Sequence, residues 1–597
     1  MALRELEYPF DTQYILKKRK ALKRKLLADG TSRLKKKIAV LGGSTTEDIV
    51  SAAELFLLNF GIEAEFYQSE YAQYWEDGVF GNAELDSFSP DLIYVCTSLC
   101  NLRFEPDPAR TREDSKALLD AEFGRFETLW DKLGRFGCPV IQNNFELPFY
   151  ALMGNMDCRH HSALGYAVNV MNLRFADYAQ EHSNFYLLDL NRTSAEYGLE
   201  RWHDRSYWYM YKYMCAREAV PYIGYQLALI VKSVYGKNRK LLALDLDNTL
   251  WGGIVGDDGV NGLAIGQETG VSQAYYEFQK YAGQLKSLGT VLTVCSKNEE
   301  ENALAGLNHP EGALRPDDFA LIKANWDPKD KNLLETVGQL DLLPSAIVFA
   351  DDNPAEREIV RQSIPEAAIP ELTEPEKYIT AISRSGYFEP VTISADDLKR
   401  SEMYRQNAKR AELAASVTDY GEYLKSLEMV GEIMPFAEIY YQRIAQLTNK
   451  SNQFNLTTRR YSESDIAGFA ASDEYITLYG KLSDKFGDNG VVSVVIGQIQ
   501  EDTLYITLWL MSCRVLKRDM ELAMLDGLVK EAKARGIKKL IGEYIPTAKN
   551  KMVKHFYDNV LGFRLVTEED DGSAKYELDI TDYTDKNKYI STGKDSL

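Results

Sequence analysis

The sequence predicts a multidomain α/β protein, and three observations lead to this prediction. The chain has 597 residues, whereas a single domain usually spans about 100–200 residues. Hydrophobic residues make up 45% of the chain and aromatic residues 11%, which is enough to fill several cores. Short apolar runs alternate with helix-like segments, a pattern typical of parallel sheets covered by helices.

We expect the first 237 residues to form a short N-terminal extension followed by one α/β unit. A basic stretch at 17–27 is expected to form a solvated helix that packs a few leucines on the body, with a membrane-surface or nucleic-acid helix as the alternative. It belongs to an N-terminal extension at 1–34. The α/β unit at 35–237 opens with an apolar run that ends in Gly-Gly-Ser and precedes a helical pattern. Further strands are expected at 92–97, 139–142 and 185–190, before a tyrosine-rich helical connection at 205–237.

The most informative run lies at 241–250, where apolar residues lead into Asp245 and Asp247. A buried parallel strand opens at its carboxyl end into a crevice that binds ligands. There Asp245 can attack phosphorus, and a second acid can protonate the leaving oxygen and then activate water. A capped strand end with solvated acids is the simpler interpretation of the pair alone. The Asp-x-Asp-x-Thr spacing resembles the haloacid dehalogenase superfamily, which implies Asp245 as nucleophile, Asp247 as general acid/base and Mg²⁺ as cofactor.

Two further strands end in polar residues that suit this site. The run 291–296 ends in Ser296, which matches the superfamily's phosphate-binding Ser/Thr. The run 346–350 is followed by Asp351 and Asp352. Together with Asp245 and Asp247, these paired acids are expected to complete a Mg²⁺ site, because carboxylate oxygens are the ligands that hard cations prefer.

A lysine and a threonine are candidates for phosphate binding. Lys329 stands just before a helical pattern at 332–340, where charge and backbone amides both favour an anion. Lys323 and Lys331 are rivals for this role. The Thr249 hydroxyl is expected to bind phosphate or to orient Asp247. Four elements in superfamily order predict a phosphate-handling domain at 238–371, with a minimal cap on its Rossmann-like sheet.

Composition excludes several other classes of protein. The net charge of −20 opposes nonspecific nucleic-acid binding, and no apolar run is long enough to cross a membrane. The N-terminus lacks the apolar core of a signal peptide, so a cytoplasmic protein is expected. Seven cysteines scattered over so long a chain predict neither a disulfide framework nor a zinc site.

The C-terminal part predicts a third domain. A helical linker is expected at 372–430, because this stretch is charged and rich in Ala and Glu. The domain at 431–597 has strands at 491–496 and 504–511, a periodic helix at 519–535 and a strand at 540–544. This order, with a late Phe-Tyr and Gly-Phe, resembles the α+β fold of Gcn5-related acyltransferases.

The turn before the periodic helix departs from that acyltransferase pattern. Lys517 stands where a glycine would allow the closest backbone approach to an acyl-carrier pyrophosphate. Ordinary acetyl-coenzyme A binding is therefore not implied. Lys517 and Arg518 are candidates to meet a phosphopantetheine phosphate instead.

The N-terminal unit resembles SGNH-type hydrolases on a flavodoxin-type sheet. Ser44 occupies the place of their nucleophile, Asn101 and Asn143 are candidates for an oxyanion hole, and His203 stands late in the unit. However, His203 lies beside Asp204 rather than in the Asp-x-x-His spacing of that fold. An active hydrolase and a retained binding or docking role are both open.

The order of the three regions resembles the FkbH family over nearly the whole chain. Its signatures are matched by Leu-Asp-Leu-Asp-Asn-Thr-Leu-Trp-Gly-Gly at 244–253, Asn-Gln-Phe-Asn-Leu-Thr-Thr-Arg-Arg at 452–460 and Met-Ser-Cys-Arg-Val at 511–515. Similar members take the glyceryl group of 1,3-bisphosphoglycerate, remove phosphate and load the acyl unit onto an acyl carrier protein as a thioester.

A thioester needs a thiolate, and two cysteines are candidates. Cys513, with Arg514 next to it, is the expected acyl-handling thiol, because nearby cations depress a thiol pKa. Cys295, one residue before Ser296, is the other candidate for this thiol. For each of the two cysteines, the simpler interpretation is a packed side chain with no role in the reaction. An acyl or substrate pocket is expected to use polar residues drawn from the family motifs, namely Asn298, Asn452, Asn455, Arg459 and Arg514.

The resulting hypothesis is a Mg²⁺-dependent glyceryl transferase and phosphatase that acts on a phosphorylated small molecule and an acyl carrier protein. A small-molecule phosphatase whose C-terminal domain only binds a partner is the second hypothesis. An acyltransferase in surface-polysaccharide synthesis is the third.

Overall fold

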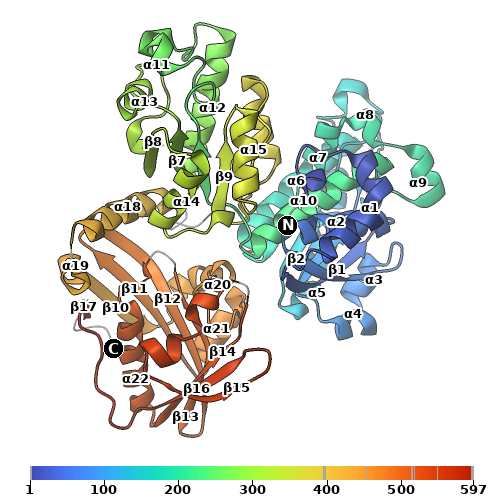
Figure 1. The fold of residues 1–597 in the computed structure, drawn as a ribbon. Coiled ribbons are helices and arrows are strands. Elements are labelled where there is room, and N and C mark those ends of the chain that lie inside the picture. Colours follow the sequence, from blue (N-terminus) through green and yellow to red (C-terminus); the bar gives the residue numbers. More distant parts are fainter. Residues whose placement is uncertain are drawn as a thin grey trace. The chain divides into compact units, whose positions relative to one another are not determined.

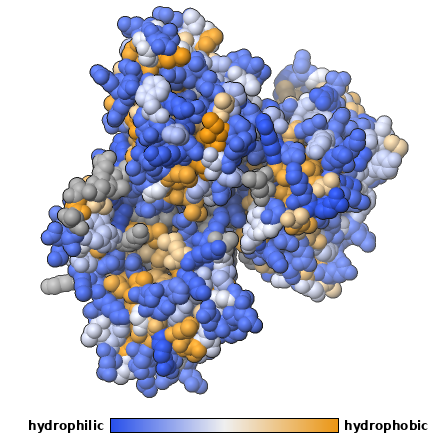
Figure 2. Space-filling model, in the orientation of Figure 1, coloured by the Kyte–Doolittle hydropathy of each residue, from blue (hydrophilic) through white to orange (hydrophobic). Residues whose placement is uncertain are grey.

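The computed structural model describes residues 3–393, 398–417, 419–451, 453–512, 515–516, 518–547 and 549–592 (Figure 1). The chain divides into two compact units, Met1–Val234 and Tyr235–Leu597. Within the described ranges, no helix combines the length and the apolar character that a membrane crossing requires. The face drawn in Figure 2 is mainly hydrophilic, with hydrophobic side chains in small separate groups.

The first unit is built on a five-stranded parallel sheet in the order β2-β1-β3-β4-β5. Its strands are β1 (Leu34–Gly42), β2 (Ile62–Gln68), β3 (Leu92–Cys96), β4 (Val140–Asn143) and β5 (Phe185–Leu188). The order reverses beside β1, so the carboxyl ends of β1 and β3 border a crevice. The strands predicted from the apolar runs are all present.

Helices cover both faces of this sheet. One group packs together on one face: α1 (Thr12–Leu27), α2 (Glu47–Asn59) and α10 (Val220–Val234). As predicted, α1 buries Leu22 and Leu26 and leaves its lysines outside. The larger helices of the other group are α5 (Arg112–Leu133) and α6 (Leu164–Glu181), and their aromatic side chains fill a core with Ile93 and Val95 of β3. The short helices are α3 (Tyr74–Val79), α4 (Ala83–Phe88), α7 (Leu190–Tyr197), α8 (Leu199–Trp202) and α9 (Arg205–Tyr211).

The second unit begins with a four-stranded parallel sheet in the order β8-β7-β6-β9. Its strands are β6 (Leu241–Leu244), β7 (Val291–Ser296), β8 (Leu321–Ala324) and β9 (Ile347–Ala350). The strand β8 has no counterpart in the sequence prediction. Around this sheet lie α11 (Val255–Asp258), α12 (Gly270–Ser287), α13 (Glu300–Leu307), α14 (Lys329–Gln339), α15 (Pro354–Ser363) and α16 (Tyr378–Arg384).

The C-terminal part forms an eight-stranded sheet in the order β15-β16-β14-β13-β12-β11-β10-β17. Its strands are β10 (Met429–Pro435), β11 (Tyr475–Asp484), β12 (Gly487–Gln500), β13 (Thr503–Met511), β14 (Lys539–Tyr544), β15 (Arg564–Glu568), β16 (Ala574–Asp579) and β17 (Ile590–Thr592). Its helices are α20 (Tyr441–Lys450), α21 (Glu463–Ala471) and α22 (Met520–Ala534). The strands from β10 to β13 are antiparallel neighbours, whereas β13 and β14 are parallel and joined through α22.

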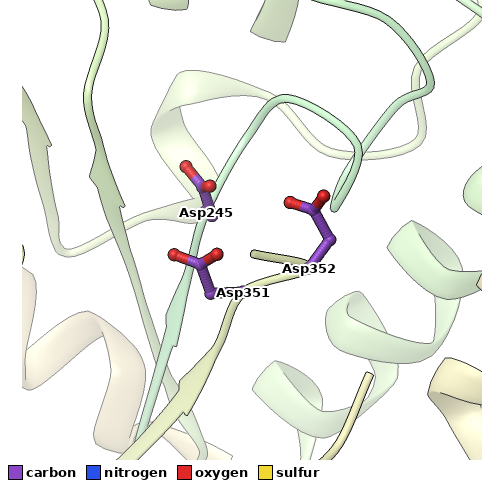
Figure 3. A group of neighbouring side chains, drawn as sticks. All are labelled: Asp245, Asp351 and Asp352. Carbon is purple, nitrogen blue, oxygen red and sulfur yellow. The ribbon is translucent and has the colours of Figure 1, made fainter. Parts of the chain in front are cut away.

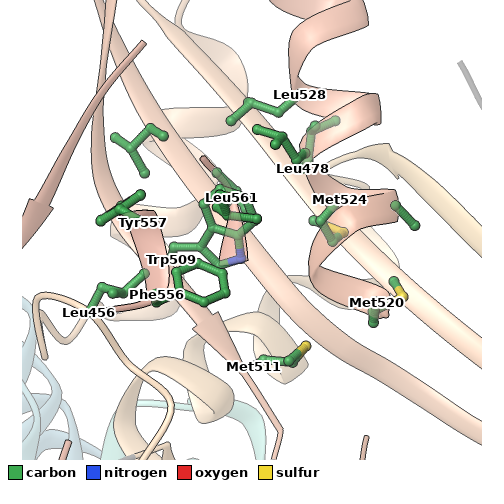
Figure 4. Close-up of a cluster of buried hydrophobic side chains, with 14 of the residues drawn as sticks. Leu456, Leu478, Trp509, Met511, Met520, Met524, Leu528, Phe556, Tyr557 and Leu561 are labelled. Atoms are coloured by element: carbon green, nitrogen blue, oxygen red, sulfur yellow. The ribbon is translucent and has the colours of Figure 1, made fainter. Parts of the chain in front are cut away.

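The core of this domain gathers aromatic and methionine side chains against α22 (Figure 4). Trp509 of β13 lies fully buried, and its ring meets Phe556 edge to face at 5.4 Å between centroids. Gly480 allows Met520 and Met524 of α22 to approach β11, because a Cβ there would lie 2.3 Å from Met520 Cε. The close helix-to-sheet packing therefore depends on this glycine.

A helix in the predicted linker is tied to packed structure at both ends. This helix, α18 (Arg400–Ser416), places Tyr404 in the core beside β7 and β9. Arg410, only 1% exposed, binds Asp484 at the end of β11 through two hydrogen bonds of 2.7 and 2.8 Å. The linker also contains a short helix, α19 (Tyr420–Ser426). The domain boundaries drawn from the sequence stay predictions.

Candidate active site

Two parallel strands bring the predicted acids together. The register pairs Leu244 of β6 with Ala350 of β9, and the amide of Asp245 donates to the carbonyl of Ala350 at 3.0 Å. Because both strands run in the same direction, the residues that follow them leave the sheet at one edge. Asp245 therefore lies beside Asp351 and Asp352.

The three acids form a compact group (Figure 3). Carboxylate oxygens of Asp245, Asp351 and Asp352 all lie within 4.8 Å of one another. Asp245 and Asp351 are buried, and Asp352 is partly buried. Hard cations with oxygen ligands suit such a set. Asp247, the fourth predicted metal ligand, is not part of this group.

Lys329 is the lysine that the structure brings to these acids. Its ammonium Nζ lies 2.7 Å from Asp245 Oδ2 and 2.6 Å from Asp351 Oδ2. The side chain stands at the first residue of α14 and is almost completely buried. Its two rivals lie elsewhere: Lys323 pairs with Glu335, and Lys331 is exposed. The structure therefore places Lys329, and neither rival, in this site.

Burial and the charges of neighbouring side chains shift the pKa values of Asp351 and Lys329. Burial raises the pKa of Asp351 to about 6, and the charge of Asp245 adds to the rise. Burial alone would lower the pKa of Lys329, but its two carboxylate partners raise it well above its ordinary value. Lys329 is therefore a permanent positive charge. Three carboxylates and one ammonium leave two negative charges when all are ionised, which matches one divalent cation.

Asp247 points its carboxylate to a separate set of donors. Oδ1 accepts hydrogen bonds from Trp251 Nε1 at 2.9 Å and from the amide of Val255 at 3.0 Å. Oδ2 accepts from Asn298 Nδ2 at 2.9 Å. Burial raises the pKa of Asp247, although these donors act in the opposite direction. A carboxylate held this way, next to the nucleophile in sequence, suits proton transfer.

Two of these partners have roles that the sequence did not show. Asn298, expected in an acyl or substrate pocket, instead orients Asp247. Trp251 is fully buried and was predicted only as part of a family motif. Thr249 contacts Asp352 and not Asp247: the Asp352 amide donates to Thr249 Oγ1 at 3.2 Å. Ser296 ends β7 in a buried position, one strand away from Asp245.

Cys295 is a packed side chain. It is 1% exposed, and its Sγ donates to the carbonyl of Lys329 at 3.5 Å. Burial raises the pKa of this thiol well above its ordinary value. A buried neutral thiol is a poor nucleophile. Cys295 is therefore a packed side chain and not the acyl-handling thiol. Cys513 and Arg514 lie outside the described residues.

The described residues that were predicted for an acyl pocket form hydrogen bonds and an ion pair with neighbouring residues of the same domain. Asn455 is fully buried, its Oδ1 accepts from the amide of Thr458 at 2.8 Å, and its carbonyl accepts from Asn550 Nδ2 at 3.0 Å. Arg459 pairs with Glu543 at 3.0 Å. Asn452 and Lys517 are not among the described residues.

The segment 454–457 lies between β13 and β14. The amide of Leu456 donates to the carbonyl of Trp509, and the amide of Met511 donates to the carbonyl of Phe454, both at 3.0 Å. On the other side, the amide of Ile545, just after β14, donates to the carbonyl of Leu456 at 2.8 Å. The two strands pair directly only from Thr503 to Ile506 of β13. The segment therefore closes the opening that these parallel strands would otherwise leave.

Arg518 was a candidate for meeting a phosphopantetheine phosphate, and the structure gives it another role. Its Nη1 lies 3.2 Å from Asp484, and its Nη2 donates to Asn407 at 3.0 Å. Burial lowers the pKa of this guanidinium to about 10. Because Arg410 binds the same carboxylate, Arg518 stabilises the contact between α18 and β11.

The predicted hydrolase residues of the first unit do not converge. The Oγ of Ser44 is buried and has no hydrogen-bond partner among the described residues. Asn101 donates to the carbonyl of Gly43, and Asn143 binds both the amide and the carbonyl of Thr97. Asn143 also donates to the carbonyl of Asn144, so both of its N–H groups are used, whereas Asn101 uses one of its two.

The predicted histidine does not contact Ser44. His203 Nε2 bonds to the carbonyl of Leu147 at 2.8 Å, and Asp204 caps α9 through the amides of Ser206 and Tyr207. Since no base activates the serine, this arrangement lacks the nucleophile-to-base contact of a serine hydrolase.

Comparison with known proteins agrees with this description. Residues 37–232 match the model of the FkbH N-terminal domain. A crystal structure of the N-terminal part of the protein BF1531 from Bacteroides fragilis, "containing phosphatase domain complexed with Mg", is 29% identical with a TM-score of 0.58. That match covers 63% of this chain and 99% of the other. The search of curated proteins found no match.

Two acetyltransferase structures resemble part of the chain at lower scores. The ribosomal-protein-S18-alanine N-acetyltransferase of Escherichia coli is 18% identical over 27% of this chain and 99% of its own, with a TM-score of 0.20. The GNAT domain of S. lividans PAT is 19% identical over 25% of this chain and 89% of its own, with a TM-score of 0.21.

The fold and the acidic site define a multidomain α/β enzyme that contains a phosphatase domain. The predicted fold class is thereby confirmed, while the SGNH-like character of the first unit stays a prediction. Residues 37–232 resemble the FkbH N-terminal domain, which agrees with the FkbH-like motifs found along the chain.

Proposed function

We propose that this protein is a Mg²⁺-dependent glyceryl transferase and phosphatase. It would take the glyceryl group of 1,3-bisphosphoglycerate, remove phosphate and load the acyl unit onto an acyl carrier protein as a thioester. The observation that supports the phosphatase half is the contact of Lys329 with both Asp245 and Asp351, with Asp247 held separately. The transferase half rests on the FkbH-like character of the chain.

The metal would be held by Asp245, Asp351 and Asp352. Their carboxylates fit a hard divalent cation in ligand type, in grouping and in net charge. When bound, Mg²⁺ would offset the repulsion between the phosphoryl group and the acids.

The protein's own residues then account for the phosphoryl chemistry. A carboxylate oxygen of Asp245 attacks phosphorus, and the bond from phosphorus to the leaving oxygen breaks. Asp247 gives that oxygen its proton and afterwards takes one from a water that attacks the aspartyl phosphate. Inorganic phosphate leaves and Asp245 is restored. Throughout, Lys329 offsets negative charge at the reacting group.

The acyl step needs a thiolate from the protein or from the carrier. The sulfur attacks the acyl carbon of 1,3-bisphosphoglycerate, the carbon–oxygen bond to the acyl phosphate breaks, and phosphate leaves. The remaining phosphate ester is then a substrate for Asp245. Cys513 is the proposed protein thiol, while the burial of Cys295 argues against that residue.

Intact-mass measurement tests this function. Wild-type protein, 1,3-bisphosphoglycerate, Mg²⁺ and a phosphopantetheinylated carrier protein are expected to yield free phosphate and a glyceryl-carrier adduct. Asp245→Asn is expected to abolish phosphate-ester hydrolysis, and Cys513→Ser to abolish the protein adduct, while Cys295→Ser serves as the matched thiol control. Phosphate release without any adduct on protein or carrier would contradict the transferase assignment.

One observation favours a second function. The segment 454–457 already bonds to β13 and to the end of β14, which leaves no open strand edge there for an extended arm. A phosphatase whose C-terminal domain only binds a partner fits this closed state. The absence of carrier loading, with phosphate release intact, would favour this alternative.

A further inference from the structure

A cavity in the first unit lies over the carboxyl ends of β3 and β4. Leu99 and Cys100 follow β3, and Glu146 and Phe149 follow β4. The remaining wall comes from the 203–214 stretch around α9. Ligands of parallel sheets bind at this edge. Ser44 does not line the cavity, whereas His203, another of the predicted hydrolase residues, does.

Glu146 places a poorly satisfied carboxyl group in the cavity wall. The residue is 1% exposed, and its carboxylate accepts from two backbone amides: that of Leu99, 3.3 Å from both oxygens, and its own. Among the described side chains, none forms an ion pair with it. Burial raises the pKa of Glu146 to about 7. Its oxygens retain lone pairs that a ligand hydroxyl could satisfy.

Arg205 places a donor in the same wall. Its Nε is buried and finds no hydrogen-bond acceptor within the described part of the chain. The guanidinium lies 4.6 Å from the ring centroid of Phe149 and 5.0 Å from that of Tyr209, which fixes its plane. A buried donor left without an acceptor carries an energetic cost. An acceptor on a ligand would remove that cost.

His203 contributes an acceptor. A carbonyl oxygen only accepts, so the 2.8 Å bond to Leu147 requires the proton on Nε2. Burial lowers the pKa of the ring, which leaves Nδ1 unprotonated. The neighbouring Asp204 is occupied as the cap of α9.

We propose that this cavity binds a small hydroxy acid, with the ligand carboxylate on Arg205 and its hydroxyl groups on Glu146 and His203. One guanidinium balances one negative charge, whereas a phosphate dianion would meet Glu146 and Asp204 without a second cation. The two acceptors call for hydroxyl donors, and Phe149 and Trp208 supply apolar walls for a short carbon chain. This site binds without hydrolysis, because it contains no activated nucleophile.

Calorimetric titration of the full-length protein with D-glycerate tests the proposal. Saturable binding is expected, with acetate, which lacks hydroxyls, and glycerol, which lacks the carboxylate, each at least about tenfold weaker. Arg205→Gln is expected to weaken D-glycerate binding by about tenfold or more. The matched control is Arg201→Gln, since Arg201 is exposed and lies outside the cavity.

Glycerate could also bind at the phosphatase site, and a third variant separates the two. Binding in the cavity should persist in Asp245→Asn and fall in Arg205→Gln. Loss in Asp245→Asn with retention in Arg205→Gln would overturn the proposal. So would the absence of saturable binding, or equal affinity for acetate. The ligand comparison uses wild-type protein, so it holds even if the arginine variant folds poorly.

Discussion

The ammonium group of Lys329 lies 2.7 Å from the carboxylate of Asp245, deep in the site where the nucleophile must meet phosphate. The other oxygen of Asp245 accepts the amide of Leu246 at 2.8 Å. The nucleophile is thus fixed by one donor from its own strand end and one from α14. This geometry orients the carboxylate before substrate arrives, which is the preorganisation that phosphoryl transfer requires.

Replacement of Lys329 is expected to be far more damaging than replacement of its exposed neighbour. Lys329→Met should lower kcat/KM for a phosphomonoester by roughly 100- to 1,000-fold, because a buried charge that stabilises the transition state is lost. Lys331→Met, the control, removes a lysine that only makes surface ion pairs and should change the rate little. Steady-state kinetics at saturating Mg²⁺ measure both. Equal effects of the two substitutions would contradict the assignment.

Trp251 is expected to act as a positioning residue for Asp247. Hydrogen bonds to a carboxylate favour its charged form, so their removal raises its pKa. Asp247 must hold a proton to act as the acid, so its deprotonation sets the alkaline limb of the pH–rate profile. Trp251→Phe should therefore move this limb to higher pH and lower kcat by roughly 10- to 100-fold. Asn298→Ala removes the donor on the other oxygen and should shift the limb in the same direction. An unchanged limb in both variants would show that these contacts are only structural.

The acids of the site could be predicted from sequence because of their place on strands. Asp245 and Asp351 each follow an apolar run, and parallel strands deliver such residues to one edge. The choice among Lys323, Lys329 and Lys331 could not be made, because it depends on which side chain the first turn of α14 buries. That is decided by packing and not by the local pattern.

Contacts between distant elements were beyond the reach of the sequence. The bond from Asn298 to Asp247 joins the loop after β7 to the loop after β6, and no residue type or spacing signals it. Conversely, Ser44 and His203 stand in plausible order along the chain, but order does not fix side-chain direction. No residue pattern predicted that the segment 454–457 would lie between β13 and β14.

Glu146 is expected to make the stability of the first unit depend on pH. Its pKa is about 7 in the folded protein, above its ordinary value of 4.5. Between these two pH values the folded state keeps the proton that the unfolded state has released. Stability therefore falls as pH rises from about 4.5 to about 7 and then levels off. Glu146→Gln should remove this loss, worth about 3 kcal/mol at pH 8.

Thermal unfolding at pH 5 and pH 8 measures this effect. Relative to the wild type, the Glu146→Gln variant should gain most stability at pH 8 and little at pH 5. Glu63→Gln, on the exposed side of β2, is the matched control and should leave the pH dependence as in the wild type. A variant that loses stability equally at both pH values would refute the titration of Glu146.

The buried charge cluster of the C-terminal domain is expected to be sensitive to loss of its one carboxylate. Asp484 binds both Arg410 and Arg518, and the two guanidiniums are buried. Asp484→Asn removes the carboxylate that both guanidiniums bind and should cost about 3–5 kcal/mol of unfolding free energy. Asp488→Asn, at an exposed position near the start of β12, should cost less than about 0.5 kcal/mol. Urea denaturation that gives equal costs for the two would contradict the role of the cluster.

Hydrogen exchange can decide whether the segment 454–457 is a fixed part of the sheet. The amides of Leu456, Met511 and Ile545 are all donated within this three-way contact, so slow exchange is expected for each in the free protein. A pantetheine arm that enters between β13 and β14 must compete for the same backbone groups, because extended ligands bind sheets through main-chain bonds. A phosphopantetheinylated carrier should then speed exchange at Leu456, whereas the carrier without the arm should not. Carrier loading with unchanged exchange at all three amides would show that the arm reaches the acyl group by another path.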